Sequence, residues 1–165
     1  MNEIFGFDAY APKEIAERIE TIGVAKARLP LVSQIALGIL AGGFIALGAL
    51  YFTLVTSDGS LGFAASRLLG GVTFSLGLVL VVVAGAELFT GNNLLVLAWA
   101  SRRITNGELL RNWLIIYLAN FIGALGLVAL VYLSNHWQMN GSAVAIQAGK
   151  MAAAKATLPL CEAFF

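Results

Sequence analysis

Charged residues are scarce in this chain of 165 residues: they make up 12% of it, whereas soluble domains carry roughly 25%. Hydrophobic residues account for 59%, and the mean hydropathy is +0.87. This composition does not fit a soluble protein and predicts an integral membrane protein. The net charge of +1 gives no ground for binding a nucleic acid or an acidic substrate.

Cysteine and histidine are each present only once. The single Cys161 excludes a disulfide within the chain, and its apolar neighbours favour a small buried thiol over a reactive one. The only histidine, His136, lies in a polar stretch and is predicted to be a surface residue. One histidine also argues against a bis-histidine haem, and hence against a membrane anchor subunit of a redox enzyme. No cofactor or metal is expected.

A cleavable signal peptide is not expected, because the first long apolar run begins only after Pro30. Residues 1–30 instead predict an amphipathic helix at the membrane surface, followed by a transmembrane domain over residues 31–165. Its apolar face would be formed by three residues at helical spacing: Ile15, Ile19 and Ile22.

Two uninterrupted apolar segments, 31–55 and 112–134, are each long enough to cross a bilayer. Small residues on each predict close helix contacts. These are Gly38 and Gly42 in the first segment, and Gly123 and Gly126 in the second. Asn120 needs polar partners within the membrane and is predicted to cross-link helices. Polar connections are expected at 56–66, 101–111 and 135–142, and segment 143–165 is only weakly apolar.

The most informative segment, 70–97, is apolar but interrupts itself with GAELFTGNN. Unpaired backbone groups cost several kcal/mol in hydrocarbon, so a broken helix is tolerated only where protein or a wet cavity satisfies them. This segment therefore predicts a pore or binding site. Glu87 supports that interpretation, since a carboxylate at membrane depth costs roughly 2.5 kcal/mol or more. The alternative is that Glu87 pairs with a neighbouring helix.

Two further features suit an anion. Free backbone amides over 88–93 would present partial positive charge, and the Thr90 hydroxyl could contact the substrate. Lys155 lies among small apolar residues, where its charge would attract a monovalent anion. The alternative is that Lys155 extends its ammonium group to the membrane interface.

Several stretches resemble the formate/nitrite transporter family. The sequence FSLGLVL at 74–80 and GAELFTGN at 85–92 are similar to its second membrane helix. NWLIIYLANFIGA at 112–124 resembles the third helix, and KATLPLCEAFF at 155–165 resembles the start of the fourth. The resemblance implies an all-α, aquaporin-like bundle of two inverted halves, with a pore in each protomer of a homopentamer. This chain would supply the first three membrane helices and the start of the fourth.

The resemblance also implies roles for individual residues, including an apolar constriction, a threonine facing a central histidine, and a lysine near the pore. That histidine is missing here, and Ala119 replaces a usual glycine, which leaves open how closely its helix packs. The candidate pore and substrate-binding residues are Phe74, Leu78, Glu87, Leu88, Phe89, Thr90, Gly91, Asn92 and Lys155. For each apolar residue taken alone, simple contact with the bilayer or the core is the competing interpretation.

The implied function is a channel or proton-coupled transporter for small monovalent anions, formate first and nitrite or hydrosulfide next, with no covalent chemistry. Basic residues bias the N-terminus and the 101–111 connection towards the cytoplasm of a bacterial or archaeal inner membrane. Those on this side are Lys13, Arg18, Lys26, Arg28, Arg102, Arg103 and Arg111, against Arg67 and Lys150. The alternatives are a membrane anchor subunit of a redox enzyme and a non-conducting fragment of a transporter. The resemblance implies that the second inverted half of the bundle would follow Phe165. Without that half, the chain is expected to insert into the membrane but not to conduct selectively.

Overall fold

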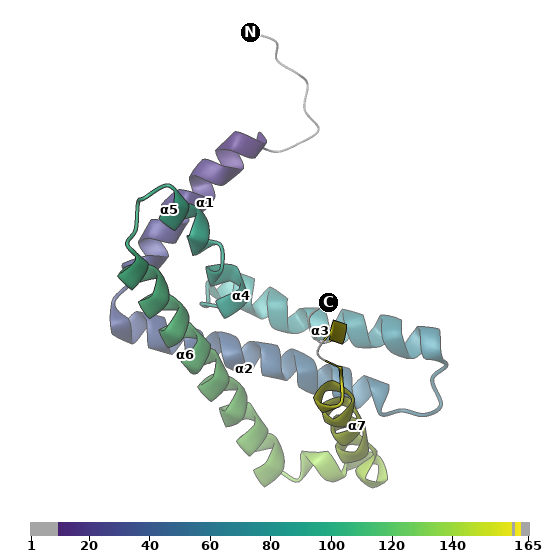
Figure 1. Cartoon of the computed structure of the whole chain (residues 1–165). Helices are drawn as coiled ribbons and strands as arrows, with labels where there is room; N and C mark the ends of the chain where they lie inside the picture. Colours follow the sequence, from purple (N-terminus) through teal and green to yellow (C-terminus); the bar gives the residue numbers. More distant parts are fainter. Residues whose placement is uncertain (1–9, 160, 163–165) are drawn as a thin grey trace.

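The structure, a computed structural model, describes residues 10–159, 161 and 162. In this part of the chain all regular secondary structure is helical, which confirms the predicted all-α class (Figure 1). The elements are α1 (Pro12–Ala27), α2 (Leu31–Thr56), α3 (Phe63–Ala84), α4 (Phe89–Asn92), α5 (Leu95–Ala100), α6 (Asn106–Leu133), the 3-10 helix η1 (His136–Gln138) and α7 (Met139–Ala156).

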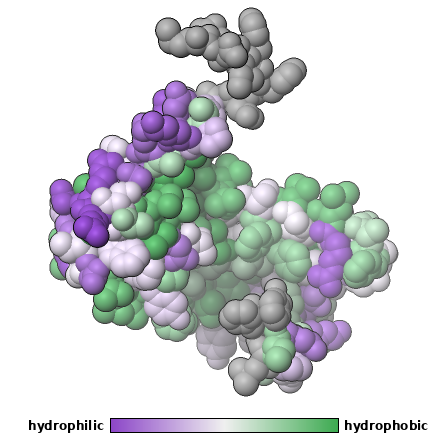
Figure 2. Space-filling model, turned by 45° about the horizontal axis from the view of Figure 1, so that its top comes forward, coloured by the Kyte–Doolittle hydropathy of each residue, from purple (hydrophilic) through white to green (hydrophobic). Residues whose placement is uncertain are grey.

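Three helices, α2, α3 and α6, are long and apolar enough to cross a membrane, with mean hydropathies of 2.1, 2.1 and 2.4 over their most apolar windows. α2 is the central one: α3 runs beside it and α6 crosses it on another face (Figure 1). Hydrophilic residues gather over the end of the molecule that carries α1 (Figure 2). The predicted start of a fourth membrane helix falls on residues 155–165, part of which lies outside the described residues.

Glycines let the helices approach α2 on two faces. A Cβ atom on Gly42 would overlap the carbonyl oxygen of Asn120, and one on Gly38 would lie 2.6 Å from the Cβ of Ala119. Ala119 therefore does not hold α6 away from α2. On the other face, a Cβ on Gly48 would lie 2.7 Å from the carbonyl oxygen of Phe74 on α3. The expected contact at Gly38 and Gly42 is confirmed.

The contact predicted at Gly126 is not made by the described residues. A Cβ atom added there meets no atom within 4 Å among the described residues, whereas one on Gly123 would overlap the carbonyl oxygen of Ile39. The two glycines are three positions apart on α6, and α6 crosses α2 at an angle, so only the first lies at the crossing point (Figure 1).

Several predicted boundaries and environments also need correction. α6 begins at Asn106, not at 112, because Thr105 and Glu108 form a capping box: the Thr105 hydroxyl accepts from the Glu108 amide, and the Glu108 carboxylate accepts from the Thr105 amide at 2.8 Å. α3 likewise begins at Phe63.

The predicted environments of Cys161 and His136 also differ from those in the structure. Cys161 is exposed, since it follows the end of α7, and His136 is half-buried rather than at the surface.

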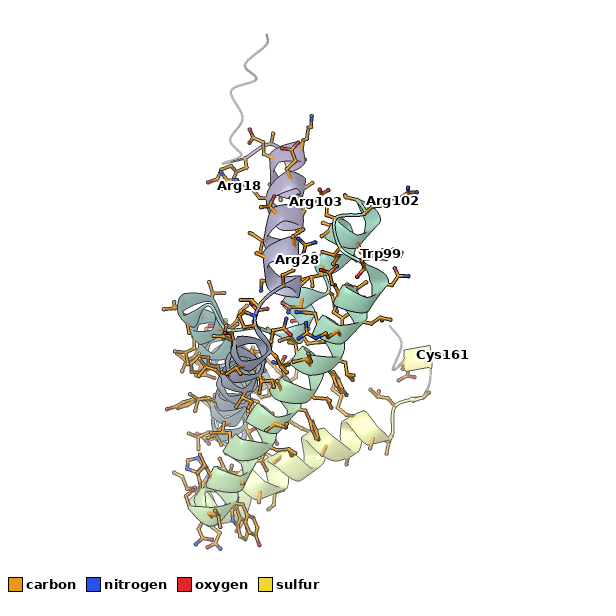
Figure 3. All side chains as sticks on the ribbon, turned by 90° about the vertical axis from the view of Figure 1, so that its left-hand side faces the viewer. Arg18, Arg28, Trp99, Arg102, Arg103 and Cys161 are labelled. Atoms are coloured by element: carbon orange, nitrogen blue, oxygen red, sulfur yellow. The ribbon has the colours of Figure 1, made fainter. Side chains whose placement is uncertain are left out.

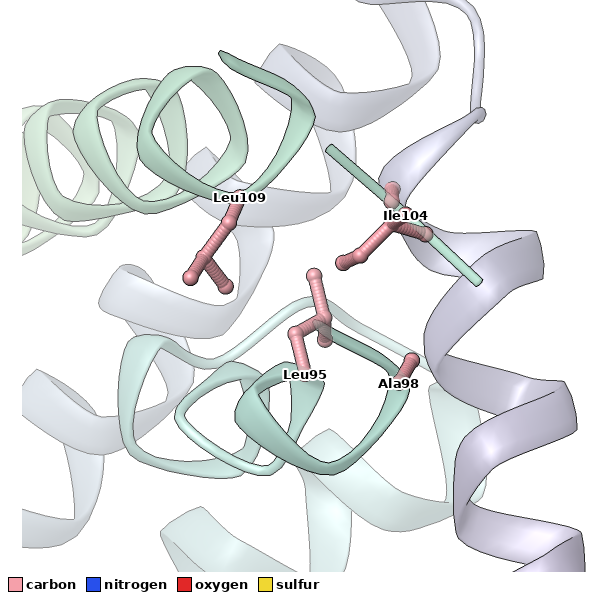
Figure 4. Packing of buried hydrophobic residues seen from close by; sticks show 5 residues of the cluster. Leu95, Ala98, Ile104 and Leu109 are labelled. Carbon is pink, nitrogen blue, oxygen red and sulfur yellow. The ribbon is translucent and has the colours of Figure 1, made fainter. Parts of the chain in front are cut away.

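α1 packs against α5 through its small residues, and the placement of its isoleucine face at the membrane surface stays a prediction. Ile15 and Ile22 are 45% and 53% exposed, whereas the small residues Gly23 and Ala27 are buried. Ala27 joins a cluster whose other members come from α5, the following turn and the start of α6: Leu95, Ala98, Ile104 and Leu109. In Figure 4 these four side chains point towards one another. The small face of α1 allows this close contact with α5, where a Cβ on Gly23 would lie 3.1 Å from the Cβ of Ala98.

The glycine contacts give a test with a matched control. Gly42→Ala is expected to lower the free energy of unfolding by about 1–3 kcal/mol, because the added methyl group must displace the backbone of α6. Gly126→Ala on the open face should have little effect. Both can be compared by thermal unfolding of the purified protein in detergent. Equal unfolding temperatures for the two variants would contradict the described α2–α6 contact.

Candidate functional site

The helix breaks after Ala84, inside the predicted segment. Gly85 adopts a left-handed conformation, with φ of 62°, which ends α3. The amide of Ala86 donates to the carbonyl oxygen of Val81 at 3.0 Å, as in the Schellman motif that commonly ends helices. The chain then runs without helical structure until α4 begins at Phe89. Several backbone groups are thereby left without a helical partner.

The side chain of Asn120 on α6 pairs two of these groups and one carbonyl group of α2. Its Nδ2 donates to the carbonyl oxygens of Gly38 and Glu87, at 2.8 and 2.9 Å, and its Oδ1 accepts from the Phe89 amide at 2.8 Å. The Glu87 amide donates to the carbonyl oxygen of Leu37 on α2. The prediction that Asn120 cross-links helices is confirmed, and it joins α2, α6 and the break.

Three amides at the break remain free. Those of Leu88, Thr90 and Gly91 donate no hydrogen bond to any described residue. The sequence predicts free amides over 88–93, and the structure leaves these three, because Asn120 takes the Phe89 amide and the Asn92 and Asn93 amides bond within the short turn. A small anion is the kind of ligand that such amides attract.

The Glu87 carboxylate is buried, with 4% of the residue exposed, and is paired. Its Oε1 lies 3.0 Å from Nζ of Lys26 on α1, and its Oε2 accepts from Nδ2 of Asn92 at 2.8 Å. Asn92 also donates to Oδ1 of Asn112, whose Nδ2 donates to the carbonyl oxygen of Lys26. The alternative for Glu87, pairing with a neighbouring helix, is therefore what the structure contains, and Asn112 has found its partners.

Lys26 is a site residue that the sequence predicts only as one of the basic residues that set orientation. No local signal could have revealed its role, since Lys26 Nζ reaches Asn92 across 66 positions of sequence. α1 brings Lys26 to the break because Gly23 and Ala27, on either side of it, pack against the segment that follows the break. The ion pair leaves the carboxylate compensated at the site.

A hollow of about 600 Å³ opens beside the break. Its lining combines the unbonded amides with apolar side chains of α3. The lining residues are Ile22, Lys26, Leu78, Val81, Val82, Gly85, Ala86, Glu87, Leu88, Thr90 and Gly91. Five of the predicted site residues are thus brought together here: Leu78, Glu87, Leu88, Thr90 and Gly91. Asn92 is buried directly beside Glu87.

Three predicted residues do not line this hollow. Phe74 packs edge-on against Phe52, with ring centroids 6.5 Å apart. Phe89 packs against Trp113 and Tyr117 of α6, at 6.5 and 5.4 Å. Lys155 is exposed on α7, an element that contacts α2 and η1 and not the break.

The family profile described as "Formate/nitrite transporter" matches residues 13–165. The chain belongs to the formate/nitrite transporter family. Its members are transporters and not enzymes, and the three apolar helices accordingly make this chain part of an integral membrane protein. The sequence-based assignment to this family is confirmed.

Individual relatives agree with this family assignment. The chain is 44% identical over 132 residues to "Formate channel FocA" of Escherichia coli K12, an alignment that covers 79% of this chain and 46% of the relative. It is 48% identical over 120 residues to "Uncharacterized transporter YrhG" of Bacillus subtilis 168, covering 69% and 44%. The chain spans about half the length of the curated relatives it matches.

A solved structure described as "Pentameric formate channel with formate bound" superposes with a TM-score of 0.70 at 26% identity. The superposition covers 93% of this chain and 55% of the neighbour. The expected fold, in which this chain provides roughly one half of a larger helical bundle with a broken second membrane helix, is confirmed.

The ion pair at the break can be tested by removing one partner and then both. Lys26→Met is expected to lower the free energy of unfolding by about 3–5 kcal/mol, because it leaves the Glu87 carboxylate buried without its counter-charge. Adding Glu87→Gln should recover most of that loss, since the amide needs no cation. Unfolding in detergent for the two single variants and the double variant gives the coupling energy. A strictly additive cycle would show that the pair does not form.

Proposed function

We propose that the protein conducts small monovalent anions across a membrane, with formate as the first candidate substrate. The observation that carries this proposal is the set of three unbonded amides, those of Leu88, Thr90 and Gly91, at a hollow beside a broken membrane helix. Partial charges on amides attract an anion without holding it as strongly as a fixed cation would. The naming of relatives as formate channels supports the choice of formate.

The charge balance at the break favours the same substrate class. A lone carboxylate at Glu87 would repel anions, but its partner Lys26 compensates it at 3.0 Å. The electrostatics of the hollow are then decided by the amides and the Thr90 hydroxyl. The apolar side chains of Leu78 and Leu88 disfavour a strongly hydrated ion, because they offer nothing to replace its water.

The remaining predicted residues receive proposed roles outside the hollow. Phe74 lies one helical turn before Leu78 on α3, and the two are proposed to narrow the same path, with Phe89 closing it from α4. Asn92 positions Glu87 through its hydrogen bond. Lys155 is proposed to attract the anion at a separate point on the path.

We further propose passage as a neutral acid after proton uptake, which avoids most of the cost of desolvating the ion. Nitrite and hydrosulfide are secondary substrates in this proposal. The assembly is proposed to be a homopentamer in the lipid bilayer of a bacterial or archaeal inner membrane, with the N-terminal residues 1–30 on the cytoplasmic side and residues 31–165 forming part of the transmembrane domain.

Substitution of Thr90 tests the substrate site. Thr90→Val keeps the shape of the side chain but removes its hydroxyl. We expect formate flux into proteoliposomes, measured by light scattering, to fall about tenfold or more, because one hydrogen bond to a charged ligand is lost. Thr90→Ser should retain most of the flux. Nitrite, lactate and hydrosulfide measured alongside would rank the substrates. Unchanged saturable formate flux in Thr90→Val would place the pore elsewhere.

Cysteine labelling tests the proposed orientation. In a Cys161→Ser background, Gly107→Cys near the start of α6 should resist an impermeant thiol reagent in intact cells, whereas Met139→Cys at the start of α7 should react. Both positions are exposed in the structure, so burial does not account for the difference. The reverse pattern would overturn the orientation derived from the basic residues.

A further inference from the structure

The turn between α5 and α6, residues 101–105, carries two arginines with very different surroundings. Arg103 lies 3.6 Å from the Glu20 carboxylate and also donates to the Thr21 hydroxyl. Arg28, beside it, pairs with Glu108 at 3.0 Å. These two cations are therefore paired with carboxylates of the protein itself, between α1 and the start of α6.

Arg102 has no such partner. Its side chain is exposed and makes no ion pair or hydrogen bond with any described residue. Its backbone is in the left-handed region, with φ of 57°, where glycine or asparagine is more easily accommodated. Glycine or asparagine would therefore fit this backbone conformation better, and no contact within the described residues explains an arginine at position 102.

A hollow of about 510 Å³ lies beside Arg102, lined by Trp99, Ala100, Arg102, Ile104, Thr105 and Asn106. The Trp99 ring is held in place because its N–H donates to Oδ1 of Asn106, and 41% of the residue remains exposed. In Figure 3, Trp99 and Arg102 lie on the side of the turn away from α1, whereas Arg103 lies beside α1 and Arg28 lies at the end of α1.

The hollow lies where an apolar surface meets a polar one. Leu110 and Leu114 on α6 are 61% and 62% exposed, and the polar turn 101–105 follows α5 directly. Tryptophan is enriched at the boundary between hydrocarbon and water. Trp99 therefore marks the depth at which the head groups of the surrounding lipids begin, and Arg102 lies at their level.

We infer that this hollow binds the head group of an anionic phospholipid, such as phosphatidylglycerol. The planar guanidinium group of Arg102 matches a phosphate with two parallel hydrogen bonds. The Nδ2 of Asn106 offers a further donor on the wall, since only the Oδ1 of this side chain is bonded to a described residue, the Trp99 ring. The acyl chains would lie along the exposed leucines. Glu108, the nearest acidic side chain in sequence, is already occupied by Arg28 and by the Thr105 cap. This site is separate from the hollow at the break and does not rest on the proposed transport function.

Brominated lipids provide the test, because bromine quenches the fluorescence of a tryptophan that it touches. The full-length protein is reconstituted in phosphatidylcholine vesicles containing brominated phosphatidylglycerol or, as the comparison, brominated phosphatidylcholine. The share due to Trp99 is the part lost in Trp99→Phe. We expect brominated phosphatidylglycerol to quench Trp99 more strongly than brominated phosphatidylcholine does. Arg102→Gln should reduce this preference about fivefold, which is the effect expected for removing one basic residue near an anionic membrane.

Two further variants separate a local site from general attraction. Arg111→Gln removes another exposed cation that has no ion pair among the described residues, and should leave most of the preference intact. Arg102→Gly should lose the preference yet raise the unfolding temperature in detergent, because glycine relieves the left-handed backbone.

Three results would overturn the inference: equal quenching by the two lipids, equal losses in Arg102→Gln and Arg111→Gln, or displacement of the lipid by millimolar inorganic phosphate. The last would show a site for a soluble anion.

Discussion

The side-chain amide of Asn120 is the interaction on which the broken helix depends. A break at membrane depth exposes backbone groups that each cost several kcal/mol if left unpaired in hydrocarbon. One asparagine supplies two donors and an acceptor, and at this position it bonds the carbonyl oxygens of Gly38 and Glu87 and the amide of Phe89. α6 can bring it that close to α2 only because Gly42 and Gly123 have no side chains at the crossing.

The charge balance at the helix break depends on α1. Asn120 pairs the backbone around Glu87 but leaves its carboxylate charge uncompensated, and Lys26 provides the counter-charge from a helix outside the three apolar ones. The docking of α1 against α5 is therefore part of the site. The free amides of Leu88, Thr90 and Gly91 are then the main electrostatic feature that the proposed anion would meet.

Much of this arrangement follows from short-range patterns in the sequence. Hydropathy gave the three apolar helices, the GAELFTGNN run gave the break, and Asn120 stood out as a polar residue in an apolar helix. The sequence does not predict which residues far apart in the chain come into contact. The Lys26–Glu87 pair, the turn of Phe89 towards Trp113 and Tyr117, and the open surroundings of Gly126 all depend on the crossing of helices. The start of α6 is different, since the Thr105–Glu108 capping box is a local pattern that marks it in the sequence.

The proposed anion site at the break requires a neutralised Glu87 carboxylate and free amides beside it. Formate flux into proteoliposomes, compared between Lys26→Gln and Lys26→Gln/Glu87→Gln at equal amounts of folded protein, tests it most directly. We expect the single variant to conduct poorly, because a bare carboxylate faces the hollow, and the double variant to recover formate flux. Equal flux in the two variants would contradict it.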